Sequence, residues 1–280
     1  MQVGDQILSF YANYIESSLG IIYSPENYYQ LQKRLEQVAT KLGFADINKM
    51  HEKLEQGIFG QAKALILDAA TNNETLFFRD KNMFTGFEKF LADKSSPFSY
   101  GPYKELKIWS AACSTGQEPY SLSFILHEWQ KQDSNRKYSI FATDFSNRVL
   151  DYSRKGEYSF LEIQRGIESA DRSKYFEQSS DKSNDFWSVK QEYRKNMKFD
   201  QLNLQAAWPL VEKVDFIFLR NVLIYFDLET KSKILSKMVN KLNDGGHIVL
   251  GSAESMVGIS NDFESVKYGT GNFYRKKNRS

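Results

Sequence analysis

The sequence predicts an α/β protein with an N-terminal helical bundle, a doubly wound sheet and a small β-rich insert. Three patterns support this expectation. Apolar residues recur at helical spacing through residues 1–70. From residue 105 onward, short apolar runs alternate with helix-like segments, as in a mainly parallel sheet. Between residues 155 and 205, polar turns and short β-like runs interrupt that alternation. A chain of 280 residues is long enough for about two domains.

The composition excludes several classes of protein. Lys and Arg number 37 against 35 Asp and Glu, so no overall field favours a nucleic-acid partner. A single cysteine excludes an internal disulfide, and three scattered histidines without a C-x-x-C motif predict no metal site. No apolar run approaches the roughly 18 residues of a membrane span, and the N-terminus lacks a signal-peptide pattern. We therefore expect a cytoplasmic monomer with no membrane insertion.

Residues 1–70 are expected to form the helical domain. The first helix carries apolar residues at i, i+3, i+4, i+7 and i+8, namely Ile7, Phe10, Tyr11, Tyr14 and Ile15. A second helix begins at Ser24-Pro25, because serine suits the N-cap and proline the first helical position, and it ends at Gly43. Two more helices follow, around residues 47–54 and 65–69. The polar side of the second helix is either simply solvated or a docking surface for an acidic partner, and it carries Lys33, Arg34 and Lys41.

Residues 71–92 are predicted to join the two domains. The stretch Thr71–Asp80 (TNNETLFFRD) breaks the helical pattern with turn-forming residues and then presents the apolar pair Phe77-Phe78. A helix resumes over residues 82–91. Two interpretations of the stretch remain open. It is either a helix cap with a buried aromatic pair and a surface arginine, or a linker that directs polar side chains into a cleft of the second domain, namely Asn73, Thr75 and Arg79.

The second domain, residues 93–280, shows the alternation typical of a doubly wound sheet. Predicted strands cover residues 106–110, 138–143, 214–219 and 247–251. Predicted helices cover residues 119–130, the surroundings of Val149-Leu150, and residues 229–242. Two further runs, residues 263–267 and 272–275, indicate a closing antiparallel hairpin.

The insert, about residues 155–200, does not fit a βα unit. It contains a polar, turn-like loop at Ser179–Asn184. Short β-like runs follow at Phe186–Val189 and Met197–Phe199. The insert is either an edge hairpin or a contact for a partner.

The stretch Lys107–Leu126 predicts a ligand site. It comprises a buried strand, a turn of small residues that ends at Gly116, and a helix that begins near Pro119. Unpaired N–H groups at such a helix end suit a carboxylate or phosphate, and Gly116 and its small neighbours would let a ligand approach the backbone. A βα turn that serves only packing would carry the same residues.

In an open α/β sheet, ligands bind at the carboxyl ends of the strands. Those ends carry the turn before Gly116, Asp144 and Arg220-Asn221. Asp144 would accept hydrogen bonds from both hydroxyls of a ribose, although an aspartate at a strand end can also simply cap a loop. The glycine-rich G-x-G-x-x-G turn is absent, which argues against NAD and favours S-adenosylmethionine.

Six motifs, in order from residue 71 to residue 255, resemble those of the chemotaxis-receptor glutamate O-methyltransferases, the CheR-type family. They are TNNETLFFRD, IWSAACSTGQEPYSLS, FATDFSNRVLDYSRKGEY, FDQLNL, FIFLRNVLIYFD and GSAES. The resemblance implies a helical N-terminal domain and a Rossmann-like methyltransferase domain with a small β-subdomain. It implies S-adenosylmethionine as methyl donor, with S-adenosylhomocysteine as product. It also implies a chemoreceptor cytoplasmic domain as partner, contacted through the basic helix face and the β-subdomain.

The resemblance assigns roles to individual residues. Those that match cofactor-binding positions of the family are Asn73, Thr75, Arg79, Glu118, Asp144, Asn203, Leu204, Arg220 and Asn221. Tyr225 matches the tyrosine beside the methyl acceptor, and Arg79 would help to place that acceptor. Gln117 replaces the first of two acids that many members have, but Glu118 remains, so we expect cofactor binding to be retained. The loop at residues 179–184 matches no family motif.

A glutamate acceptor, ionised at neutral pH because its pKa is about 4.3, needs no general base. The enzyme would instead align the carboxylate oxygen, the methyl carbon and the sulfonium. Two alternatives remain open: a methyltransferase for another acceptor, and a non-catalytic sensor that binds S-adenosylmethionine. The balanced charge and the sequence RNVLIY, where amino-methylating nucleic-acid enzymes carry an Asn-Pro-Pro-Tyr type motif, argue against a nucleic-acid acceptor.

Overall fold

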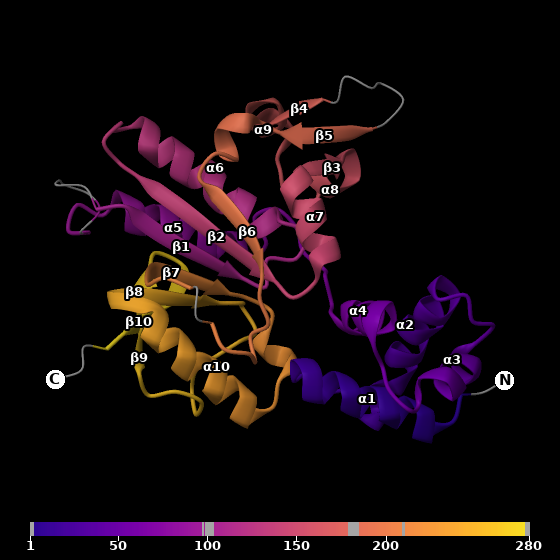
Figure 1. Ribbon diagram of the computed structural model, residues 1–280. Helices are drawn as coiled ribbons and strands as arrows, with labels where there is room; N and C mark the ends of the chain where they lie inside the picture. The colour runs from indigo at the N-terminus through magenta and orange to yellow at the C-terminus, as the bar shows by residue number, and fades with distance from the viewer. Residues whose placement is uncertain (1–2, 97, 99–103, 179–184, 209–210, 278–280) are drawn as a thin grey trace.

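The computed structural model describes residues 3–96, 98, 104–178, 185–208 and 211–277. Figure 1 shows a helical lobe beside a larger lobe built on a sheet. The helical lobe consists of α1 (Asp5–Leu19), α2 (Tyr28–Lys41), α3 (Ile47–Leu54) and α4 (Gly60–Ala70). A 3₁₀ turn over Pro25–Asn27 precedes α2, so this helix begins slightly later than the Ser24-Pro25 signal predicts. Among the described residues, no helix is long and apolar enough to cross a membrane.

The larger lobe contains a seven-stranded sheet in the order β6-β2-β1-β7-β8-β10-β9. The strands from β6 to β8 run parallel, and β10 is antiparallel to both β8 and β9. In chain order their bounds are β1 Leu106–Ala111, β2 Tyr138–Asp144, β6 Met197–Gln201, β7 Val214–Leu219, β8 Leu242–Leu250, β9 Phe263–Tyr268 and β10 Gly271–Lys276. The predicted α/β class, with its parallel sheet and closing hairpin, is confirmed.

Helices cover both faces of the sheet because alternate residues of each strand point to opposite sides. On β7, Phe216 and Phe218 pack with α5 (Lys81–Ala92) and α6 (Gln117–Lys131). The intervening Ile217 and Leu219 pack instead with α10 (Leu228–Lys241). The phenylalanines of α5 make edge-on ring contacts with β7, for example Phe90 with Phe216 at 4.7 Å between centroids. This burial on both faces explains why β7 reads as a continuous apolar run.

The insert forms a separate three-stranded antiparallel sheet in the order β3-β5-β4. Its elements are β3 (Glu157–Ser159), α8 (Phe160–Gln164), α9 (Ser169–Tyr175), β4 (Phe176–Gln178) and β5 (Phe186–Val189). The loop Ser179–Asn184 lies outside the described residues. A short 3₁₀ helix, η2 (Gln191–Tyr193), leads back to the main sheet.

One expectation for the insert is wrong. The run Met197–Phe199 belongs to β6, which pairs in parallel with β2 at the edge of the main sheet. The run carries β-forming residues but no information about its partner, so the sequence pattern could not decide which sheet it joins. Strand β6 therefore lies beside β2, the strand that ends at Asp144. Just after β6, the Leu202 N–H donates to the Asp144 carbonyl at 2.9 Å.

Two short elements follow strands at the carboxyl edge of the sheet. A short helix α7 (Asn147–Lys155) follows β2, and a 3₁₀ turn η3 (Leu223–Tyr225) follows β7. The strand after α10 begins at Leu242, five residues before the predicted start at His247, with a register shift opposite Val214. Gly245-Gly246 lies inside this irregular stretch, which is why the sequence suggested a turn there.

Candidate functional site

A cavity lies at the carboxyl ends of β1 and β7, where an open α/β sheet binds its ligands. Its volume is about 60 Å³, and it is partly open to solvent. Six predicted site residues line it: Thr75, Arg79, Glu118, Arg220, Asn221 and Tyr225. The other lining residues are Asn72, Glu74, Ala112, Cys113, Ser114 and Ile224. The cavity thus combines the linker between the lobes, the turn after β1 and the segment after β7.

The turn after β1 has an unusual backbone. Ala112 and Ser114 both have positive φ angles, 61° and 51°. Such conformations cost free energy in residues other than glycine and concentrate at functional sites. They bring the backbone N–H of Ser114 to the Asp144 carboxylate, which it contacts at 2.9 Å.

Asp144 sits behind this turn and does not line the cavity. Its carboxylate accepts hydrogen bonds from the N–H groups of Ser114 and Ser146, at 2.9 and 3.0 Å. Burial raises the pKa of Asp144, and these two N–H groups, together with that of Phe145, oppose the shift. A carboxylate has about four lone-pair positions, so Asp144 keeps acceptor capacity for a hydroxyl donor.

Gly116 has a different role from the predicted one. Its φ angle is 96°, and a Cβ atom at this position would come within 2.8 Å of the Tyr158 hydroxyl and 3.0 Å of Ser153. The missing side chain therefore makes room for the insert and for α7 rather than for a ligand. The Tyr158 hydroxyl donates to the Thr115 carbonyl at 2.7 Å and ties the insert to this turn.

Arg220 forms a buried charge network at the base of the cavity. Its side chain is 2% exposed and forms ion pairs with Glu118 and Asp80, each at 2.9 Å. It also donates to the Arg79 carbonyl at 2.5 Å, while Ser110 Oγ donates to the second oxygen of Glu118 at 2.7 Å. Glu118 and Arg220, two of the predicted cofactor-binding residues, thus bind each other.

Asn221 is held in a left-handed conformation, with φ at 58°. Glu254 explains this geometry, because its carboxylate accepts from the N–H groups of Asn221, Val222 and Gly251 at 2.7–2.9 Å. The carboxylate therefore joins the ends of β7 and β8. Glu254 belongs to the GSAES motif, yet sequence reasoning assigned it no role.

The linker reaches the cavity through several single contacts. Ser114 Oγ donates to the Asn73 carbonyl at 2.8 Å, and Arg79 Nη1 donates to the Glu74 carbonyl at 2.8 Å. Phe77 is fully buried against the insert, and its carbonyl lies so close to Gly166 that a Cβ there would clash at 1.9 Å. The interpretation of residues 71–80 as a linker that contacts the second lobe therefore agrees with these contacts.

Asn203 and Leu204 do not line the cavity. The Asn203 amide donates to the Ser18 carbonyl at 2.9 Å, near the end of α1. Leu204 is buried in the core under α10. Sequence reasoning did not anticipate that the end of α1 lies against this segment, because nothing near Ser18 signals a contact with the second lobe.

The basic residues of α2 divide into two groups. Arg34 does not lie on a free surface, because its guanidinium donates to Tyr23 Oη and to the carbonyls that end α4, at Ala69, Ala70 and Thr71. Lys33 and Lys41 are exposed. Arg34 thus fixes the start of the linker, and two of the three predicted docking residues remain available.

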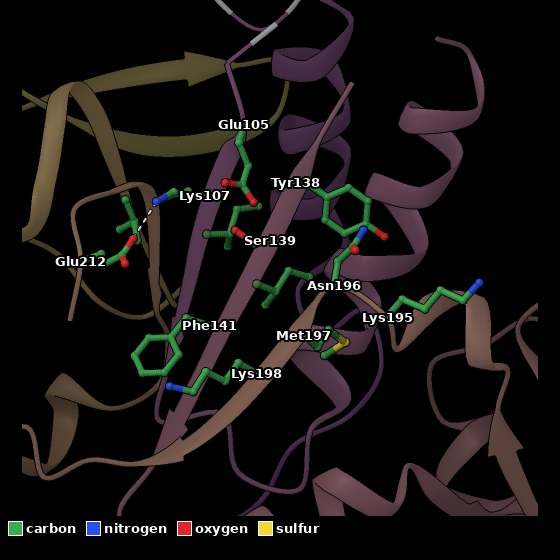
Figure 2. Close-up of a pocket in the computed structure, with 13 residues that line it drawn as sticks. Glu105, Lys107, Tyr138, Ser139, Phe141, Lys195, Asn196, Met197, Lys198 and Glu212 are labelled. Carbon is green, nitrogen blue, oxygen red and sulfur yellow. Dashed lines mark hydrogen bonds and ion pairs between the residues drawn. The ribbon is translucent and has the colours of Figure 1, made fainter. Parts of the chain in front are cut away.

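A larger cavity lies at the opposite edge of the sheet (Figure 2). It is bounded by the amino ends of β1, β2 and β6, and Lys107 spans part of it in an ion pair with Glu212 at 2.7 Å. None of the predicted site residues lines this cavity. Its position at the amino ends of the strands argues against a role in the chemistry.

Residues 73–271 match the family model described as CheR methyltransferase, SAM binding domain. The chain belongs to the CheR methyltransferase family. A chemotaxis protein methyltransferase of Vibrio parahaemolyticus is 36% identical, over 98% of this chain and 98% of its own length. Chemotaxis protein methyltransferase Cher2 of Pseudomonas putida is 31% identical, over 99% of this chain and 100% of its own length.

As a member of the CheR family, the protein is an S-adenosylmethionine-dependent methyltransferase, as the sequence predicted. The residues present fit this cofactor. Asp144 keeps acceptor capacity behind the cavity, and the Ala112–Ser114 turn lines the cavity.

Sequence reasoning missed several residues of the site. Asn72 and Glu74 lie within the quoted linker motif, and Ile224 lies within RNVLIY, but none of them was assigned a role in the site. Ser114 was noted only as a small turn residue, although its N–H and Oγ contact Asp144 and the linker. Only the three-dimensional contacts distinguish these residues from their neighbours.

Proposed function

We propose that this methyltransferase transfers the methyl group of S-adenosylmethionine to glutamate side chains on the cytoplasmic domain of a chemoreceptor, giving glutamate methyl esters. One observation carries the proposal. Tyr225 and Arg79, from distant parts of the chain, line the same cavity as the strand-end residues Glu118, Arg220 and Asn221. When bound, the cofactor supplies an electrophilic methyl group on a sulfonium. Membership of the CheR family supports the choice of acceptor.

The chain would contribute positioning rather than proton transfer. A glutamate carboxylate is ionised at neutral pH and is already a nucleophile. No histidine lines the cavity as the structure describes it, and the Glu118 carboxylate is engaged by Arg220 and Ser110. Holding the reacting atoms in line accounts for up to about 7–11 kcal/mol of a barrier. That is the contribution we assign to the cavity walls.

Arg79 and Tyr225 would place the acceptor. One guanidinium N–H of Arg79 is held by the Glu74 carbonyl, which fixes the orientation of the group and leaves other donors for a carboxylate. Tyr225 offers a neutral hydroxyl at the same cavity. We assign Asn73, Thr75, Asp144, Asn203 and Leu204 to the cofactor, with the last two on the adenine side beyond the cavity lining.

The receptor would approach the open side of the cavity. Lys33 and Lys41 on α2 present positive charge to an acidic helix. Leu161 and Phe186 are exposed apolar residues on the insert, at 63% and 40% exposure. We propose that these two surfaces contact the receptor outside the methylated segment.

The test is incubation with methyl-labelled S-adenosylmethionine and chemoreceptor cytoplasmic domains from the same organism. A carboxyl methyl ester releases its label as methanol in mild base, whereas an N-methyl group keeps it. Base-labile label on receptor glutamates is the expected result. Base-stable label would indicate another acceptor, and cofactor binding without any transfer would support a sensor.

A further inference from the structure

Asn72 of the linker contacts the proposed acceptor-side tyrosine. Its side-chain Nδ2 donates to the Tyr225 hydroxyl at 2.8 Å. Both residues line the cavity, although they come from distant parts of the chain. Neither the family resemblance nor the sequence pattern gave Asn72 a role in the site.

The orientation of the Asn72 amide is fixed from its other end. Its Oδ1 accepts the backbone N–H of Glu74 at 3.4 Å, so the NH₂ group must face the tyrosine. The backbone is anchored on both sides of the residue. Arg34 donates to the Thr71 carbonyl at 3.1 Å, and Ser114 Oγ donates to the Asn73 carbonyl at 2.8 Å.

This contact determines how the tyrosine hydroxyl can act. A phenol oxygen accepts through its lone pairs and has one proton to donate. Because Asn72 donates its hydrogen bond to a lone pair of the Tyr225 oxygen, the hydroxyl proton of Tyr225 must point elsewhere. In the described part of the chain no acceptor takes it, so it stays available to a group that enters the cavity.

We propose that Asn72 is a positioning residue for methyl transfer, because it makes the Tyr225 hydroxyl a donor to the acceptor carboxylate. The inference rests on the proposed function, in which a glutamate carboxylate enters beside Tyr225. One hydrogen bond from a neutral phenol orients the carboxylate, and its other lone pairs remain free to attack. Asn72 acts through the tyrosine and touches no reacting atom.

Two substitutions separate this role from simple packing. Asn72→Ala removes the donor and should lower kcat on the receptor substrate about threefold. Asn72→Asp replaces the donor by an acceptor, which would take the tyrosine proton away from the substrate, so kcat should fall about tenfold. These losses match the range of one neutral hydrogen bond. The cofactor Kd should change less than about twofold in both.

The same two substitutions in a Tyr225→Phe background provide the decisive measurement. If Asn72 acts through the hydroxyl, neither should lower kcat further there. An equal loss in both backgrounds would overturn the inference. Direct repulsion of the acceptor by the introduced carboxylate, or a general disturbance of the linker, would lower kcat whether or not the tyrosine hydroxyl is present. Asn240→Ala is the matched control, since Asn240 is also exposed and donates to a single oxygen, that of Ser236 at 3.2 Å.

The design also distinguishes failure of this inference from failure of the proposed function. If Tyr225→Phe alone leaves kcat unchanged, the role proposed for the tyrosine is wrong. If Tyr225→Phe lowers kcat but Asn72→Asp does not, only the role of Asn72 is wrong. Because Asn72 is exposed, all variants should keep the wild-type unfolding temperature, which is measured alongside.

Discussion

The two walls of the cavity are held in different ways. The sheet wall, which we define as Ser114, Glu118 and Arg220 together with Asp144 directly behind Ser114, is largely buried, and its charged groups have several partners each. The linker wall, residues 71–80, is half-buried or exposed except at Phe77. Near the cavity, Asn72 and Arg79 hold it through exposed hydrogen bonds, whereas its last residue, Asp80, is tied to the sheet wall by the ion pair with Arg220. The sheet wall is part of the folded core, whereas the linker wall packs against the surface of that core.

This difference predicts which property each wall controls. A change in the sheet wall should reduce stability or cofactor affinity, because buried polar groups would lose their partners. A change in the linker wall should reduce turnover and leave the fold intact, because exposed groups cost little to alter.

The largest effect is expected for Arg220→Met. The substitution leaves Glu118 and Asp80 without their buried cation, and breaking a buried pair in this way costs about 3–5 kcal/mol. Urea unfolding measures the loss. The matched control is Lys233→Met, which breaks an exposed pair with Glu229 and should cost less than about 1 kcal/mol. If the two variants are equally stable, the buried network does not hold the sheet wall.

An acid titration tests the sheet itself, away from the cavity. Burial, together with Arg275, lowers the pKa of His247 to about 4. The unfolded chain protonates this histidine below about pH 6.5, so stability is full above that pH and falls as the pH drops. The loss should reach about 2 kcal/mol at pH 5 and about 3 kcal/mol at pH 4.

The measurement is the free energy of unfolding between pH 7 and pH 5 for the wild type and for His247→Phe. Phenylalanine keeps the ring stack on Phe216 and cannot be protonated. Burial also lowers the pKa of His127, which contributes with the same sign in both proteins, so the difference between the two curves isolates His247. Parallel curves would show that His247 is not buried neutral.

The contrast between the walls also explains what the sequence could predict. All strands of the main sheet were predicted as β segments, and all but β6 were placed in this sheet, because burial on one or both faces leaves a clear apolar pattern. The edge strand β6 was assigned to the insert, since β-forming residues do not specify their partner strand. The Glu118–Arg220 pair could not be derived, because its partners are 102 residues apart.

The linker wall was harder to predict in detail. The family motif indicated Thr75 and Arg79 as site residues, and both line the cavity. Only the structure shows that Asn72 contacts Tyr225. Likewise, the space at Gly116 and the role of Arg34 depend on residues from distant elements that no local pattern reveals. Spacing predicts elements and strand ends, whereas pairing between distant elements depends on packing.

On the sheet wall, Asp144→Ala should weaken cofactor binding by about 1–3 kcal/mol, the cost of losing partners for buried polar groups. Isothermal titration with S-adenosylhomocysteine measures the change. Asp200→Ala is the control, because Asp200 lies on the neighbouring strand β6 and forms its ion pair with exposed Lys198 at 3.2 Å. Equal affinity for the Asp144→Ala variant and the wild type would refute the ribose role.

Beside the linker wall, Tyr225→Phe should lower kcat about tenfold, or about 1.4 kcal/mol, and leave the cofactor Kd nearly unchanged. Among the described residues the hydroxyl accepts one hydrogen bond, from exposed Asn72, so its removal should not affect the fold. Tyr29→Phe, at an exposed tyrosine of α2, is the control. A collapse of cofactor affinity would place Tyr225 on the cofactor side instead.

The smallest effect is expected where the helical lobe meets the sheet lobe. Arg148 on α7 pairs with Asp68 near the end of α4 at 2.7 Å, just before the linker begins. The arginine side chain is 59% exposed, so Arg148→Ala should cost less than about 1 kcal/mol of stability. Because the pair anchors the start of the linker wall, kcat on the receptor should fall about twofold at low salt.

The salt dependence of kcat separates a charge effect of Arg148 from a packing effect. At about 0.5 M salt the wild type should lose part of the same advantage, because a screening length of roughly 4–5 Å weakens an exposed pair in contact at 2.7 Å without abolishing it, so the two kcat values should move closer together. Lys131→Ala is the control, since its pair with Glu128 lies within α6 and crosses no lobe boundary. If Arg148→Ala impairs turnover equally at low and high salt, the arginine side chain holds the linker wall by packing and not by its charge. The contact with α7 would then make the start of the linker wall as firmly packed as the sheet wall.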